Sequence, residues 1–129
     1  PDGGDVEMMD DMAITGPIQI IDLAMTSVIR ESDGCAARVQ TSFPLTSSQI
    51  FIAARARNVQ SGTSVEVEWF NESRLVLRDS WTIPVNAEDY CFWFSLTPQD
   101  VPFVAGNWSA WLYVNGQPIG EPLTFSIEP

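Results

Sequence analysis

Apolar and polar side chains alternate along most of this sequence, and this two-residue period limits its fold more than any other feature. In the clearest case, residues 50–57, one set of side chains is Ile50, Ile52, Ala54 and Ala56, and the other is Phe51, Ala53, Arg55 and Arg57. Successive side chains of a β-strand point to opposite faces of a sheet, so this period predicts half-buried strands.

The same reasoning predicts strands along the whole chain, separated by turns rich in Gly, Pro, Asn, Asp and Ser. They cover 18–29, 37–43, 50–57, 65–70, 75–81, 90–96, 108–114 and 123–127. Asn115-Gly116 predicts a two-residue hairpin turn. The only candidate helix, 13–25, contains Gly16-Pro17. Seven to eight short strands predict an all-β, antiparallel sandwich or barrel. Loops of unequal length favour a Greek-key sandwich.

The charged residues exclude several classes of function. The chain of 129 residues has 17 acids and six arginines, with neither lysine nor histidine. It cannot build a Ser-His-Asp triad or supply a Schiff-base lysine, and its negative charge would repel nucleic acid. No metal-ligand spacing or membrane-spanning run is present. We therefore expect no catalytic residues, metal or cofactor, and no enzyme activity.

Carboxylate pairs are the remaining acid–base candidates. Glu66 and Glu68 lie two residues apart on one face of a predicted strand, but nothing in the sequence supplies the cleft that glycoside hydrolysis needs. The favoured interpretation pairs them with Arg55 and Arg57 as a cross-strand charge ladder on an exposed face.

The acidic charge is concentrated at the N-terminus. Residues 1–12 contain five acids and no base, which predicts a flexible acidic tail or linker. The rest of the chain, 13–129, holds twelve acids and six arginines and is predicted to form the sandwich. The folded part is therefore only mildly acidic.

Two cysteines, Cys35 and Cys91, lie far apart and have no neighbouring metal ligands. They are either two buried free thiols or one disulfide that closes a long loop. A disulfide is the favoured alternative, and it would indicate an oxidising compartment.

Five segments of the sequence resemble a bacterial immunoglobulin-like domain of secreted proteins and lipoproteins. They are SQIFIAARARN (48–58), GTSVEVEW (62–69), FSLTP (94–98), GNWSAWLYVNG (106–116) and FSI (125–127). The resemblance implies an immunoglobulin-like β-sandwich located outside the cytoplasm, in the periplasm, on the cell surface or secreted. It also implies an accessory or binding role without catalytic residues.

Large aromatic side chains on the outward parity of the strands are the candidate partner-binding residues. They are Phe51, Phe70, Trp93, Trp111 and Tyr113. Trp and Tyr are enriched at the cores of interfaces. Three alternatives would bury these rings: an error in register, coverage by 13–25, or coverage by the segment around Cys35.

The leading hypothesis is a non-catalytic interaction domain, an accessory subunit that docks onto a larger membrane or cell-surface protein assembly through this aromatic face. A carbohydrate-binding module is the first alternative, with Trp93, Trp111 and Tyr113 stacking on sugar rings. A self-associating adhesion or filament module, with strand edges pairing between copies, is the second.

Overall fold

The computed structural model describes residues 16–129, and within this range it contains nine β-strands and no helix. The strands are β1 (Gln19–Thr26), β2 (Ser42–Pro44), β3 (Ile50–Val59), β4 (Ser64–Asn71), β5 (Arg74–Thr82), β6 (Ala87–Leu96), β7 (Gly106–Val114), β8 (Gln117–Pro118) and β9 (Leu123–Glu128). No helix in this part of the chain could span a membrane. The tail predicted for 1–12 lies outside the described residues.

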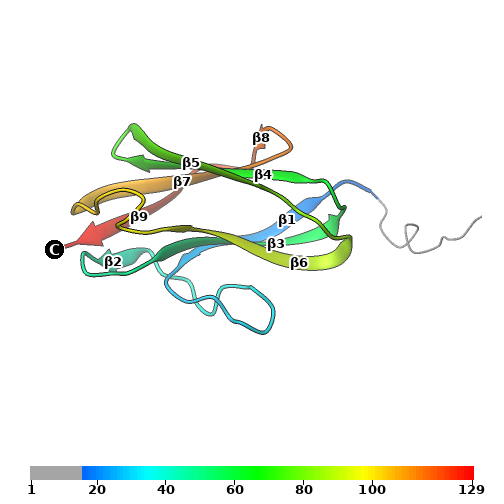
Figure 1. Ribbon diagram of the computed structural model, residues 1–129, viewed down its shortest axis with the longest axis horizontal. Helices are drawn as coiled ribbons and strands as arrows, with labels where there is room; N and C mark the ends of the chain where they lie inside the picture. The colour runs from blue at the N-terminus through cyan, green and yellow to red at the C-terminus, as the bar shows by residue number, and fades with distance from the viewer. Residues whose placement is uncertain (1–15) are drawn as a thin grey trace, which may run out of the picture.

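The strands form two sheets packed face to face (Figure 1). The three-stranded sheet has the order β1-β3-β6, and the six-stranded sheet has the order β2-β9-β7-β4-β5, with β8 paired to β7. All pairs are antiparallel except β2 with β9. From β1 to β7 the chain changes sheets at every connection except the one between β4 and β5, which makes it an immunoglobulin-like Greek-key sandwich. The predicted fold class is confirmed.

The core lies between the sheets and is filled by the inward side chains that the alternation predicted. Phe125 of β9 packs at its centre, with its ring centroid 6.2 Å from those of Trp69 and Trp108 and 5.7 Å from that of Phe43. Trp69 is fully buried, and its indole N–H has no hydrogen-bond partner among residues 16–129. Each such side chain contributes roughly 1.5–3 kcal/mol or more through burial of apolar surface.

The largest departure from the predicted strands lies between β1 and β2. The first strand ends at Thr26, and the strand predicted for 37–43 is reduced to Ser42–Pro44. Residues 27–41 instead form a loop with a bridge of its own between Ile29 and Ala36. Apolar residues predicted strand at both ends of this segment, but its backbone instead forms hydrogen bonds within the loop and, near Gln40 and Thr41, with β1 and β9.

The hairpin turn predicted at Asn115-Gly116 is confirmed. Both residues have positive φ, 50° for Asn115 and 83° for Gly116. This is the backbone of a turn whose twist matches the flanking strands. It joins β7 to the two-residue strand β8, which the sequence did not predict.

Candidate functional site

The five candidate aromatic residues do not share one face. Phe51 and Trp93 belong to the three-stranded sheet, whereas Phe70, Trp111 and Tyr113 belong to the six-stranded sheet. The single aromatic face of the prediction is therefore wrong. All five residues do lie at outward positions of their strands, as predicted. A sandwich has two outer faces, however, and alternation within a strand does not tell which of the two a residue reaches.

Trp111 and Tyr113 are half-buried and are held by contacts within their own sheet. Their ring centroids lie 5.8 Å apart. The Trp111 indole N–H donates to the Gly120 carbonyl at 3.3 Å, and the Tyr113 hydroxyl donates to Glu68 at 2.8 Å. Because their polar atoms are already engaged, these rings act mainly as the outer covering of the sheet.

The predicted charge ladder has different partners. Glu66 and Glu68 pair with Arg78 of β5, at 3.2 and 2.7 Å, because β4 lies beside β5. Arg55 lies in the other sheet, so the pairing predicted for Arg55 and Arg57 is wrong. The hydrogen bonds from Arg78 and then Tyr113 lower the pKa of Glu68, and the bond to Glu68 raises the pKa of Tyr113.

The disulfide between Cys35 and Cys91 is present, so that prediction is confirmed in the structure. It fastens the loop 27–41 to β6 across a sequence separation of 56 residues. Gly34 brings the loop backbone close to β6: it has a φ of 77°, and a Cβ there would lie 3.4 Å from the Cys91 carbonyl oxygen. The free-thiol alternative is set aside.

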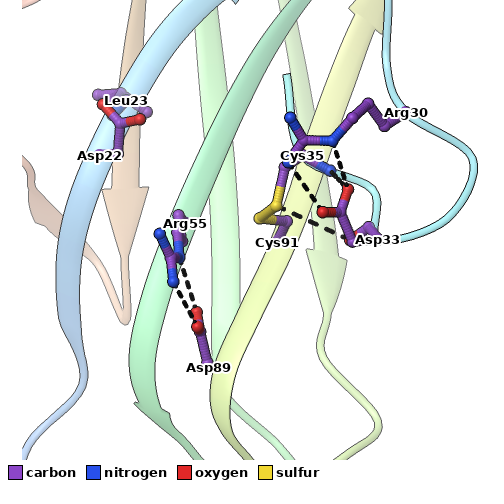
Figure 2. The surroundings of a disulfide bond; sticks show 8 residues. All are labelled: Asp22, Leu23, Arg30, Asp33, Cys35, Arg55, Asp89 and Cys91. Atoms are coloured by element: carbon purple, nitrogen blue, oxygen red, sulfur yellow. Dashed lines mark hydrogen bonds and ion pairs between the residues drawn. A yellow bond between two sulfur atoms is a disulfide. The ribbon is translucent and has the colours of Figure 1, made fainter. Parts of the chain in front are cut away.

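A polar basin of about 590 Å³ lies beside this disulfide, on the outer face of the three-stranded sheet (Figure 2). Its floor includes Ala24 and Ala53, and two ion pairs line it. Arg55 contacts both carboxylate oxygens of Asp89, at 2.9 and 2.6 Å. This contact lowers the pKa of Asp89.

The second ion pair of the basin belongs to the loop. Arg30 contacts both carboxylate oxygens of Asp33, at 3.2 and 2.8 Å. Asp33 also accepts the backbone N–H of Cys35, and its pKa is lowered by Arg30 first and by this bond second. Each guanidinium group is thus already paired with a carboxylate, one pair within the loop and one between β3 and β6. The disulfide is the covalent link that holds the loop to the sheet.

An apolar hollow of about 310 Å³ lies along β6 and is lined by Trp81 and the consecutive residues 90–94. Trp81 is 42% exposed and Trp93 45% exposed, which is high for side chains of this size. Phe51 is buried beside Trp93, with the two rings edge to face at 5.4 Å. We call Trp81 together with residues 90–94, which include Trp93, the β6 edge surface.

Sequence reasoning missed Trp81. It pairs with Val65 of β4 and therefore faces inward, as does Asp79, which pairs with Val67. The three-stranded sheet does not extend over β5, so these inward positions reach solvent. Asp79 was the residue in the sequence that could have revealed this exposure. A carboxylate at an inward position, two residues from Trp81, indicates a stretch of strand that the opposite sheet does not cover.

No protein-family model matches this chain, and no curated protein matches it. Among solved structures, it is similar to part of a β-glucosidase from Listeria innocua in complex with glucose, with a TM-score of 0.53, 8% identity, and coverage of 84% of this chain and 16% of that chain. Two structures of a β-glucosidase from Kluyveromyces marxianus give TM-scores of 0.35 and 0.36 at 12% and 13% identity. They cover 83% and 86% of this chain and 15% of theirs.

The likeness to the Listeria structure concerns the fold alone. The chain spans about a sixth of the length of the Listeria enzyme. It is a small β-sandwich domain that resembles one portion of a much larger glycosidase.

Proposed function

We propose that this chain is a non-catalytic interaction domain that works outside the cytoplasm and docks onto a larger protein assembly through the β6 edge surface. The observation that carries the proposal is the pair of exposed tryptophans, Trp81 and Trp93, on either side of an apolar hollow. Tryptophan is among the residues most enriched at binding hot spots, where it fills pockets near the centre of an interface.

Two further observations support this role. The similar portion of the Listeria enzyme is 16% of a larger chain, which is the setting of an accessory domain. The disulfide between Cys35 and Cys91 supports an oxidising compartment, because such bonds are rare in the cytosol. Intact mass of protein isolated from its source, alkylated before and after reduction, tests the compartment: two thiols that alkylate without reductant would contradict it.

The structure changes which aromatic residues we assign to the interface. Trp93 is kept and Trp81 is added. Phe51 supports Trp93 from below, while Trp111 and Tyr113 cover the opposite sheet. The docking surface is therefore one edge of the sandwich and not a broad aromatic face.

The test is affinity capture from the producing organism, followed by reconstitution with the purified captured protein. We expect Trp81→Ala and Trp93→Ala each to weaken binding by about 2 kcal/mol or more. Leu75→Ala is the matched control, because Leu75 lies on β5 and is also 42% exposed. Equal binding by wild type and both tryptophan variants would refute the assignment.

A glycan is the second candidate ligand, and the same exposed tryptophans favour it because indole rings stack on sugar rings. Gel electrophoresis in polysaccharide-containing gels and a glycan array separate the two candidates. Retention that is lost in Trp93→Ala would support the glycan; absence of retention with every polysaccharide would leave the protein partner.

A further inference from the structure

The free edge of β6 offers more than two exposed rings. β6 pairs with β3 on one side and with no strand on the other within the described residues, so one row of its backbone N–H and C=O groups has no strand partner. The hollow is lined by five consecutive residues, 90–94. The loop 27–41 contacts β6 at Cys91, within this stretch. Side chains on one face of a strand would contribute every second residue, so an unbroken run means that the hollow follows the backbone edge.

We infer that this edge binds an extended polypeptide segment as an added β-strand. The inference rests on the proposed function and specifies the form of the partner. Backbone hydrogen bonds to β6 would supply affinity that is independent of sequence, and alternate side chains of the segment would supply specificity. The side chains on one face of the bound segment would contact Trp81, on the inner side of the edge. Those on its other face would contact Trp93, on the outer side.

Charge indicates the composition of this segment. The described residues hold twelve acids and six arginines. Asp79 is exposed and lies on the same face of β5 as Trp81. Its neighbour Arg78 points to the other face, where Glu66 and Glu68 engage it. A second copy of this chain would bring a matching excess of acids, so self-pairing is disfavoured. A segment with apolar residues at alternate positions and lysine or arginine near Asp79 is favoured.

The experiment is selection of short random peptides displayed on phage against the full chain, with counter-selection on the Trp81→Ala/Trp93→Ala double variant. Both side chains are exposed, so the variant should fold, and circular dichroism verifies this. We expect enriched peptides that combine alternating apolar residues with basic residues, and synthetic copies that bind the double variant at least about tenfold more weakly. Absence of enrichment over the double variant would overturn the inference.

Backbone pairing needs its own readout. Two N-methylated forms of an enriched peptide, each blocking alternate amides, should differ strongly in affinity, because only one row of peptide N–H groups can face β6. Hydrogen exchange should slow at alternate amides of residues 90–94 when the peptide binds. Equal affinity of the two forms, or protection elsewhere, would overturn the inference. Binding of a folded partner that depends on Trp81 and Trp93 without slowed exchange would contradict strand addition alone and leave the proposed function standing.

Discussion

Removal of the disulfide tests the covalent link between the loop 27–41 and the sheet. In the loop-closure model, a cross-link across 56 residues lowers the entropy of the unfolded chain by an amount equivalent to about 4 kcal/mol at room temperature. Replacing both Cys35 and Cys91 with alanine should therefore lower the free energy of unfolding by about 3–4 kcal/mol. It should also raise the denaturant m-value, because the unfolded chain becomes less compact.

Urea titration followed by tryptophan fluorescence measures both quantities. Wild type should behave like the double variant once reductant is added, and reductant should leave the variant unchanged. Single replacements are avoided because each leaves a free thiol. A loss below about 1 kcal/mol would refute the reasoning, since it would mean that the link does not constrain the unfolded chain. An effect of reductant on the cysteine-free variant would mean that reductant acts other than by breaking the disulfide.

Three further predictions concern the core, the outer face of the six-stranded sheet and the β7–β8 turn. Trp69→Ala should cost about 3–5 kcal/mol in urea titration because it leaves a cavity. Trp69→Phe should cost less than about 2 kcal/mol because it keeps an aromatic ring in the core and loses only an indole N–H that has no partner among the described residues. Glu68→Gln should return the pKa of Tyr113 toward its ordinary value of 10.0, measured by NMR titration of labelled tyrosine. Because the pKa of Glu68 is lowered from 4.5, the stability it adds is present above that pH and is lost as the pH falls through the folded-state value. Unfolding measured at neutral and acidic pH should therefore differ less in Glu68→Gln. Gly116→Ala should cost about 1–2 kcal/mol in thermal unfolding, because the φ of 83° is strained for alanine.

Each of these predictions has a contradicting outcome. Equal losses for the two Trp69 variants would mean that the ring volume kept by phenylalanine does not stabilise the core. An unchanged pKa of Tyr113 in Glu68→Gln would remove the hydrogen bond as its cause. Unchanged thermal stability in Gly116→Ala would show that the turn relaxes to another backbone conformation.

The strand pattern predicted the fold because alternation reports burial directly. Ile52 and Leu112 are inward in the sequence pattern and buried in the structure. The same pattern failed at 27–29 and 37–41, which were predicted as strand but belong to a loop held by a disulfide and by local hydrogen bonds. Alternation also could not assign Phe51 and Tyr113 to opposite sheets, because strand order depends on contacts between segments far apart in the sequence.

The docking surface was predictable only in part. Trp93 was predicted correctly because it occupies an outward position of its strand and is also exposed in the structure. Trp81 was not found because its exposure depends on the unequal widths of the two sheets, a tertiary property that no single strand encodes. Asp79 at an inward position was the local sign of it.

The most direct test of the central claim is site-specific photo-crosslinking in the producing organism. A photoreactive phenylalanine analogue is placed at Trp81, at Trp93, or at Tyr113 on the opposite sheet. We expect one discrete crosslinked partner from the two β6 edge positions and none from position 113. Crosslinks from position 113 to the same partner, or none from either edge position, would contradict this expectation.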